Sequence, residues 1–358
     1  MKRVLVMAGG TGGHVFPALA VAQLLREGGH QIEWLGTAQR IEARVVPAAG
    51  IKLNTISVEG VRGKSKLSML IAPLKIVKAV LQARAVLRRF NPDVVLGMGG
   101  FASGPGALAA YSLGLPLVIH EQNAVAGVTN TQSRRFARRI LQAFPNAFKN
   151  EPQGEVVGNP VRGPILTMAP PAERFAGRQG PIRLLVVGGS LGASALNELL
   201  PRALAALLPA ERPEVLHQSG ENHLSQTQAA YVDAGVEARV VPFIESMDQA
   251  YSWADLVICR AGALTVSEIG IAGVPALFVP FPHAVDDHQS ANARYLVAAG
   301  GADLIQQSEL SVERFLEWFR QHQSREHLLE IAERARAQGH PEAARRVADI
   351  CLEVCSES

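Results

Sequence analysis

The segment from Val257 to Ala293 concentrates residue types that could bind an anion. An apolar run, Leu256–Cys259, is typical of a buried strand, and Arg260 follows at its carboxyl end. Gly262 then leads into a predicted helix that contains Glu268. A helix N-terminus and an arginine favour phosphate, and a carboxylate can accept two hydrogen bonds from a vicinal diol such as ribose. The pattern predicts a site for a molecule with a diphosphate at one end and hydroxyls at the other. An ordinary βαβ unit with a surface ion pair is the alternative.

A glycine-rich turn follows the first predicted strand, Arg3–Met7. The turn reads Ala8-Gly9-Gly10-Thr11-Gly12-Gly13-His14, and Pro17 is expected to begin the next helix. Such turns let backbone N–H groups approach phosphate, although they can also serve only tight packing of a helix on a strand. The dinucleotide fingerprint G-x-G-x-x-G fails because its third glycine falls on Val15, and no phosphate-binding loop G-x-x-x-x-G-K-[ST] is present. Nicotinamide and ATP binding are therefore disfavoured.

The same order of elements returns 180 residues later. Strand Arg183–Val187 precedes the turn Gly188–Ala193, and a helix is expected from about residue 195 to 208. Internal repetition of a strand, a glycine turn and a helix indicates two similar halves. Each half is predicted to be a doubly wound parallel sheet. A segment dense in glycine and proline, Gly158–Pro164, is the expected hinge between them.

Two further polar segments follow predicted strands of the first half. A third glycine turn, Gly97–Gly106, follows strand 93–98. The four residues His120-Glu121-Gln122-Asn123 follow strand 116–119. Because ligands bind at the carboxyl ends of strands in open α/β sheets, this tetrapeptide is a candidate site; a plain helix cap before a predicted helix over 127–139 is the alternative.

Composition is that of a globular protein rather than a fibrous, disulfide-rich or membrane-spanning one. The 358 residues are 48% hydrophobic and 19% charged, and this length fits two domains. The three cysteines show no CxxC or His/Cys ligand spacing, which disfavours a disulfide framework and a zinc site. No apolar run suits a signal peptide or a transmembrane helix, so a cytoplasmic protein is expected.

Charge is divided unevenly along the chain. Residues 1–163 hold 20 Lys and Arg against 8 Asp and Glu, a net charge of +12, whereas the remainder carries −9. Residues 60–90 contain eight basic residues, no acidic one, and more apolar residues than one buried stripe needs. A basic helix with exposed apolar side chains is typical of membrane-surface binding, although a helix packed on the sheet with solvated lysines is the alternative. Nucleic acid is disfavoured because Phe90 is the only aromatic residue there.

Taken together, these motifs resemble the MurG family of peptidoglycan N-acetylglucosaminyltransferases, which have the GT-B fold. The resemblance covers the chain from Gly9 to Asn292 and rests on the three glycine turns, His120–Asn123, Gly158–Arg162 and Arg260–Glu268. It implies two Rossmann-like, doubly wound parallel-sheet domains that face a cleft. The expected domains are an acceptor- and membrane-binding domain over 1–163, a UDP-GlcNAc-binding domain over 164–340, and a helix over 341–358 that packs back on the first domain.

The resemblance implies inverting transfer of GlcNAc from UDP-GlcNAc to the C4 hydroxyl of MurNAc in undecaprenyl-diphospho-MurNAc-pentapeptide, the step from lipid I to lipid II. By carry-over, Ser190 and Arg260 contact the diphosphate, Ile244 meets the uracil through its backbone, and Glu268 holds the ribose. Some members have Gln-Gln where this chain has His288-Gln289, which leaves the role of His288 open. The remaining expected donor-binding residues are Thr11, Gly12, Gly13, Asn123, Arg162, Ala263, Leu264, Thr265, Val266, Ser267 and Gln289.

The acceptor and the membrane are expected to meet the first domain. The expected residues are Gly99, Gly100, Phe101 and Ser103 of the third glycine turn, and Lys64, Lys66, Leu70, Ile71, Leu74, Lys75 and Lys78 of the basic segment. The other implied partner is the anionic surface of the inner membrane on its cytoplasmic face, with other cell-wall synthesis proteins as further partners.

Inverting transfer needs a base and stabilisation of the departing UDP. His14 is the candidate base because it ends a glycine turn and histidine exchanges protons near neutral pH; positioning the acceptor or phosphate is its alternative role. No Asp-x-Asp pair is present to hold a metal ion, so Arg260, the helix N-terminus at Ala263 and the Gly188–Ala193 turn are expected to stabilise the charge without metal or cofactor. Three other functions stay open: a GT-B transferase on another acceptor, a UDP-GlcNAc 2-epimerase, and a membrane-bound UDP-sugar-binding scaffold.

Overall fold

The computed structural model describes residues 1–58, 66–149, 154–161, 163–189, 192–284 and 287–357, without the side chains of 66–72. The chain forms two compact units. Unit 1 comprises Met1–Arg162 together with Pro341–Ser358, and unit 2 comprises Gly163–His340. All three cysteines are buried and unpaired.

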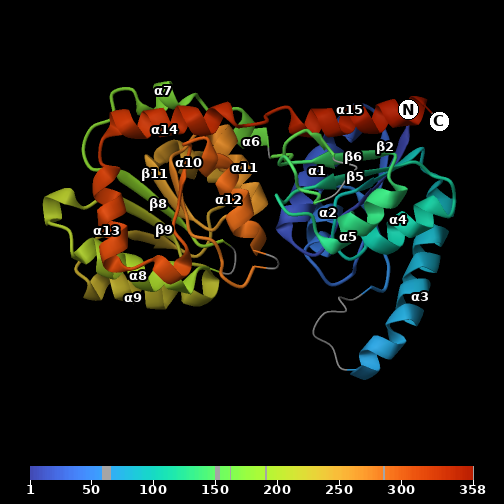
Figure 1. Ribbon diagram of the computed structural model, residues 1–358, viewed down its shortest axis with the longest axis horizontal. Helices are drawn as coiled ribbons and strands as arrows, with labels where there is room; N and C mark the ends of the chain where they lie inside the picture. Colours follow the sequence, from blue (N-terminus) through green and yellow to red (C-terminus); the bar gives the residue numbers. More distant parts are fainter. Residues whose placement is uncertain (59–65, 150–153, 162, 190–191, 285–286, 358) are drawn as a thin grey trace. The chain divides into compact units, whose positions relative to one another are not determined.

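Unit 1 is built on a seven-stranded parallel sheet in the order β3-β2-β1-β4-β5-β6-β7 (Figure 1). The strand order reverses direction between β1 and β4, and Met7 pairs with Gly97 there, so the turns after these two strands begin side by side. The strands are β1 (Arg3–Met7), β2 (Gln31–Gly36), β3 (Lys52–Thr55), β4 (Val94–Gly97), β5 (Leu117–Glu121), β6 (Arg139–Gln142) and β7 (Glu155–Val156).

Helices cover both faces of this sheet because successive residues of each strand point to opposite sides. Val4 and Val6 of β1 join the core beneath α1 and α15, whereas Leu5 and Met7 join the core beneath α3 and α4. The helices of the unit are α1 (Gly12–Glu27), α2 (Glu42–Ala48), α3 (Lys66–Phe90), α4 (Ser103–Tyr111), α5 (Val128–Ser133), the 3-10 turn η1 (Arg134–Phe136) and α15 (Ala343–Ser356).

Unit 2 repeats this plan with a six-stranded parallel sheet in the order β10-β9-β8-β11-β12-β13. Its order reverses between β8 and β11, where Val187 pairs with Cys259. The strands are β8 (Arg183–Val187), β9 (Glu214–Gln218), β10 (Arg239–Val241), β11 (Leu256–Cys259), β12 (Ala276–Phe278) and β13 (Asp303–Leu304). The α-helices are α6 (Gly163–Leu166), α7 (Pro171–Phe175), α8 (Ser194–Ala205), α9 (Leu224–Asp233), α10 (Met247–Trp253), α11 (Ala263–Ala272), α12 (His288–Ala298), α13 (Val312–Gln321) and α14 (Arg325–Ala337).

The structure confirms the two parallel-sheet α/β units that the repeated strand–turn–helix pattern predicts. Three local expectations are wrong. Helix α1 begins at Gly12 rather than at Pro17, because the glycines of the turn's second half already adopt helical conformation. Strand β5 extends through Glu121, so two of the four polar residues lie in the sheet. The helix expected over 127–139 ends at Ser133 and gives way to η1 and then to strand β6.

Candidate functional site

The candidate site residues of unit 1 gather where its strand order reverses, the place where open α/β sheets bind ligands. Thr11, Gly12, Gly13 and His14 belong to the turn after β1 and to the first turn of α1. The third glycine turn follows β4 and brings Gly99, Gly100, Phe101 and Ser103 to the same edge of the sheet. Phe101 is 43% exposed, and Ser103 is buried, donating to Met7 O at 2.9 Å and to Gly99 O at 2.7 Å.

The two glycine turns of unit 1 pack against each other so closely that a side chain would not fit. Gly100 has φ +87°, and a Cβ there would lie 2.1 Å from Gly9 O. The sequence requirement for glycine in both turns is therefore steric, and it holds the two backbones in contact.

A buried carboxylate fixes the first turn from behind. Glu42 is fully buried, and its Oε2 accepts from the Gly10 amide at 3.0 Å while its Oε1 accepts from the Thr37 amide at 3.1 Å and hydroxyl at 2.6 Å. Its contact with Gly9 is close enough that a Cβ at Gly9 would lie 2.5 Å from Oε1. Sequence reasoning missed Glu42, because nothing local marks a glutamate 32 residues beyond the turn that it holds.

The polar residues after β5 are joined to His14. His14 Nδ1 lies 2.8 Å from Gln122 Oε1, and Gln122 Nε2 lies 3.1 Å from His120 Nδ1. His120 is fully buried, and burial lowers its pKa to about 4, with the nearby charge of His14 acting in the same direction against the hydrogen bond to Gly158 O. At neutral pH His120 is therefore an uncharged hydrogen-bonding group.

Asn123, which is expected to bind the sugar donor, lies at the end of the same segment and is hydrogen-bonded to the buried carboxylate of Glu121. Glu121 Oε1 accepts from the backbone N–H of Asn123 at 2.9 Å and from the side-chain Nδ2 of Asn123 at 3.2 Å. The other oxygen accepts from Asn130 Nδ2 at 2.9 Å and from the Gly127 amide at 3.2 Å. Glu121 thus holds the loop that carries Asn123 in one conformation.

The candidate residues of unit 2 lie at the equivalent reversal of strand order. Arg260 follows β11 and is half-buried, which lowers its pKa. Its Nη1 donates to Val279 O at 3.0 Å and to Pro280 O at 3.2 Å, and its Nη2 donates to Gln307 Oε1 at 2.7 Å. Arg260 therefore ties together the loops after β11 and β12 and supplies positive charge at the strand ends. Gln307 is a partner that sequence reasoning missed.

Gln289 joins the same loops through its side-chain oxygen, which accepts from the Ala261 amide at 3.2 Å and from the Phe281 amide at 2.9 Å. Helix α11 begins beside it with Gly262 as its N-cap, a residue that offers no side chain to its first N–H groups. The amino end of a ten-residue helix beside an arginine favours an anion.

Glu268 lies in the second turn of α11 and is only 4% exposed. Its Oε2 accepts a hydrogen bond from the buried hydroxyl of Tyr251 at 3.2 Å. Tyr251 comes from α10, the helix after the loop that carries Ile244, and sequence reasoning missed it. Of the other expected residues of α11, Val266 packs in the core, Ala263 is buried, and Ser267 Oγ donates to Ala263 O at 2.9 Å. Leu264, Thr265 and Ile244 are half-buried.

Several expected site residues lie outside the described part of the structure. Arg162, Ser190 and Lys64 fall there completely. The backbone of α3 includes Lys66, Leu70 and Ile71, but their side chains are among those not described.

The described part of α3 confirms that part of the apolar surplus of residues 60–90 faces outward. Leu74 is 71% exposed, Leu81 61% and Val77 55%, and Lys75 and Lys78 on the same turns are exposed as well. In Figure 1 the amino-terminal turns of α3 extend beyond the other elements of unit 1. We call the exposed residues Leu74–Lys78 and Leu81 the α3 tip. No helix in the described ranges is both long and apolar enough to cross a membrane.

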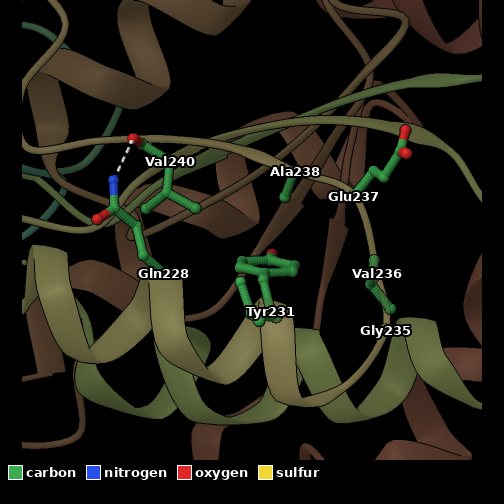
Figure 2. A pocket seen from close by; sticks show the side chains of 8 residues that line it. Gln228, Tyr231, Gly235, Val236, Glu237, Ala238 and Val240 are labelled. Carbon is green, nitrogen blue, oxygen red and sulfur yellow. Dashed lines mark hydrogen bonds between the residues drawn. The ribbon is translucent and has the colours of Figure 1, made fainter.

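A pocket of about 640 Å³ in unit 2 is lined by residues other than the candidate site residues. Figure 2 shows Gln228 and Tyr231 of α9 facing Ala238 and Val240, with Gln228 Nε2 3.5 Å from Val240 O. The pocket lies at the amino end of β10, whereas the candidate site follows the carboxyl ends of the strands. Within the described residues, no cluster of three or more His, Cys, Asp or Glu side chains is arranged to hold a metal ion.

Comparisons with known proteins agree with this arrangement. Residues 4–142 match the glycosyltransferase family 28 N-terminal domain, and residues 183–347 match the glycosyltransferase family 28 C-terminal domain. The chain is 56% identical over 351 residues to a UDP-N-acetylglucosamine–N-acetylmuramyl-(pentapeptide) pyrophosphoryl-undecaprenol N-acetylglucosamine transferase of Alkalilimnicola ehrlichii, covering 98% of each chain. The corresponding enzyme of Marinobacter nauticus is 51% identical over 356 residues, covering 99% of this chain and 98% of the relative.

Solved structures give the same result. The crystal structure of Acinetobacter baumannii MurG is similar with a TM-score of 0.87 and 44% identity, covering 99% of this chain and all of that one. The glycosyltransferase of kitacinnamycin, at a TM-score of 0.69 and 18% identity over 99% of each chain, shares the fold. The resemblance seen in the sequence motifs is confirmed: the chain belongs to glycosyltransferase family 28, and within it to the family of UDP-N-acetylglucosamine–N-acetylmuramyl-(pentapeptide) pyrophosphoryl-undecaprenol N-acetylglucosamine transferases.

Proposed function

We propose that the chain transfers GlcNAc from UDP-GlcNAc to the C4 hydroxyl of MurNAc in undecaprenyl-diphospho-MurNAc-pentapeptide, with inversion at the sugar carbon that is transferred. The observation that carries this function is the identity of 51–56% over nearly the whole chain to transferases with this acceptor in their names. Arg260 and the glycine turns after β1, β4 and β8 lie where the strand order reverses, and Glu268 lies in the helix that follows β11, which supports a site rather than a purely structural role.

The donor is assigned to unit 2. Arg260 and the amino end of α11 supply positive charge for the diphosphate, together with Ser190 of the second glycine turn. Glu268 offers a carboxylate oxygen to the ribose hydroxyls, and the backbone of Ile244 meets the uracil. Ala263, Leu264 and Gln289 are assigned to the sugar and its phosphate, and the same resemblance assigns Thr11, Asn123 and Arg162 of unit 1 to them. Positive charge of this kind stabilises the departing UDP without a metal ion.

The base is assigned to His14 of unit 1. As the C4 oxygen of the acceptor forms its bond to the sugar carbon, the bond from that carbon to UDP breaks and the hydroxyl proton moves to His14. The helix start and the two packed glycine turns hold this residue at the carboxyl edge of the sheet. A positioned base contributes about 10² to 10⁴ in rate.

The acceptor is a lipid. We assign binding of the membrane that contains it to the α3 tip. The tip combines exposed apolar side chains with Lys75 and Lys78 in a stretch without acidic residues. This combination favours peripheral binding to an anionic leaflet. The proposed location is the cytoplasmic face of the inner membrane, with other cell-wall synthesis proteins as further partners.

One experiment separates this function from its alternatives. The purified chain is given UDP-GlcNAc with a polyprenyl-diphospho-MurNAc-pentapeptide, with a diacylglycerol, or with no acceptor, and products are followed by mass spectrometry. We expect a disaccharide product from the first acceptor only, unchanged by EDTA. Conversion of UDP-GlcNAc to its 2-epimer without acceptor would indicate an epimerase, and donor binding without turnover would indicate a scaffold. A loss of activity with EDTA that Mg²⁺ or Mn²⁺ restores would contradict metal independence.

A further inference from the structure

A chain of three side-chain contacts in unit 1 links the ring of His14 to a backbone carbonyl. His14 Nδ1 lies 2.8 Å from Gln122 Oε1, Gln122 Nε2 lies 3.1 Å from His120 Nδ1, and His120 Nε2 lies 2.9 Å from Gly158 O. His120 is fully buried and Gln122 is 1% exposed. Because the last group of the chain can act only as an acceptor, the direction of every hydrogen bond in it can be worked out.

The carbonyl of Gly158 fixes the position of the first proton. Gly158 O can only accept, so His120 must carry a proton on Nε2. Burial, the largest influence, lowers the pKa of His120 to about 4, so the ring is neutral at pH 7 and holds a single proton. His120 Nδ1 therefore presents a lone pair, and the group that faces it must donate.

Gln122 supplies that donor with its amide nitrogen. A second contact fixes the same orientation independently, because Gln122 Nε2 also lies 3.3 Å from the backbone oxygen of His120, which can only accept. Turning the amide over would place its oxygen against a lone pair and a carbonyl oxygen together. The oxygen of Gln122 must then face His14, and an amide oxygen cannot donate, so His14 Nδ1 must carry a proton.

We propose that Gln122 and His120 are positioning residues that hold His14 in the tautomer protonated on Nδ1 and leave the lone pair on Nε2 for the acceptor hydroxyl. A free histidine side chain prefers the opposite tautomer, so these hydrogen bonds reverse the intrinsic preference of the ring. Gly99 makes room for the contact, since a Cβ there would lie 2.9 Å from His14 Nδ1. In the transfer, the hydroxyl proton goes to His14 Nε2, while the proton on His14 Nδ1 stays there, hydrogen-bonded to Gln122 Oε1. The role in catalysis rests on the proposed function, whereas the tautomer does not.

The tautomer can be read directly by nuclear magnetic resonance. The full chain is labelled with ¹⁵N at its 10 histidines, and the His14 signals are identified as those missing from His14→Gln. In the neutral ring we expect Nδ1 to show the shift of a protonated nitrogen and Nε2 that of an unprotonated one. A wild-type ring protonated on Nε2 overturns the proposal.

Variants then test what holds the tautomer. Gln122→Met removes the oxygen that accepts the hydrogen bond from His14 Nδ1, so His14 should move toward the form protonated on Nε2. The kcat should fall by about tenfold or more, with a smaller change in the KM for UDP-GlcNAc. Gln122→Glu keeps an oxygen facing His14, so it should retain the Nδ1-protonated form and more activity than Gln122→Met. An unchanged tautomer in Gln122→Met overturns the proposal.

The matched control is Gln142→Met on the neighbouring strand β6. Gln142 is also a buried amide, donating to Gly154 O at 2.7 Å and accepting from the Ala147 amide at 3.1 Å. Its loss should lower the stability of unit 1 yet leave the His14 tautomer unchanged. If the protein carries Nδ1-protonated His14 but transfers no GlcNAc, the proposed function fails while the tautomer assignment stands. If transfer occurs with His14 protonated on Nε2, the positioning chain fails and the function stands.

Discussion

Glu268 combines near-complete burial with a hydrogen bond from Tyr251, which keeps a carboxylate oxygen at a fixed place in α11. A carboxylate can accept two hydrogen bonds from a vicinal diol such as that of ribose, and a hydrogen bond to a charged group contributes about 1.5–3 kcal/mol. The assignment of Glu268 to the ribose therefore predicts a difference between donors rather than a general loss of activity.

The first prediction is that Glu268→Ala weakens use of UDP-GlcNAc by about 1–3 kcal/mol in kcat/KM, because the ribose loses its acceptor. A donor with 2′-deoxyribose already lacks most of this contact, so the variant should hardly distinguish the two donors. Steady-state kinetics of both enzymes with both donors measure this difference.

Tyr251→Phe is the control, because it removes the hydrogen bond to Glu268 but keeps the carboxylate. It should still prefer the ribose donor. Discrimination in Glu268→Ala equal to that of the wild type would mean that Glu268 is not the ribose ligand.

At the scale of elements, α3 packs one face into the core of unit 1 and still leaves other apolar side chains exposed. Ala79, Ala83 and Leu87 face the core of unit 1, whereas Leu74, Val77 and Leu81 lie outside it. Burial of exposed apolar groups in a membrane is not screened by salt, whereas attraction of lysines to anionic lipid is.

The second prediction is that Lys75→Glu with Lys78→Glu lowers binding to anionic vesicles by about tenfold or more, since each lysine adds about 1 kcal/mol near such a surface. Activity on a long-chain acceptor in vesicles should fall with it, while a water-soluble short-chain acceptor is used nearly as before. Adding Lys64→Glu and Lys66→Glu should extend the loss. Vesicle sedimentation at rising salt should show binding that weakens without vanishing.

Arg239→Glu with Arg320→Glu is the matched control, because it changes the net charge equally on exposed residues of unit 2. It should leave vesicle binding nearly intact. Equal losses on both acceptors in the α3 variant would mean that the segment supports folding or the active site, and the membrane assignment would be wrong.

A second element-scale feature joins α13 to the sheet edge of unit 2. His322 Nε2 lies 2.9 Å from Asp303 Oδ2, and its Nδ1 lies 2.8 Å from Trp318 O. Burial opposes the charged ring, but these two hydrogen bonds outweigh it and raise the pKa of His322, while the bond to His322 lowers that of Asp303. The ring also stacks on Trp318 at 4.7 Å and lies 5.5 Å from His327.

The third prediction follows from the sign of that shift. A histidine whose folded pKa is raised contributes stability that is fully present below its unfolded pKa of about 6.5 and is lost as pH rises through the folded value. The contribution should stay below about 1 kcal/mol because Asp303 is half-exposed. Thermal unfolding followed by tryptophan fluorescence should therefore show the wild type losing stability over His322→Gln as pH rises from 6 to 9. A constant difference across this range would contradict it.

At the scale of the whole molecule, the uneven charge and the two sheets could be predicted from sequence because each has a local signature. Strand β11 is a continuous apolar run, and the glycine turns repeat at a spacing of 180 residues. Strand β6 was missed because the basic residues around Arg139 suggested the end of a helix, and only pairing with β5 makes them a strand.

The site was predictable to the extent that its residues follow strands. Arg260, Glu268 and His14 are visible in this way, because position after a strand is a local property. Glu42 and Tyr251 could not be found, since each acts on a segment distant in sequence through contacts that only the fold creates.

The return of α15 to unit 1 has a consequence for the order in which the molecule is made. Val347, Ile350 and Val354 belong to the same core as β1 and α1, yet the ribosome adds them only after all of unit 2 has been synthesised. Unit 2 is continuous in the chain and has its whole core available earlier. One face of the sheet of unit 1 therefore stays incompletely covered during synthesis until unit 2 and then α15 have been translated.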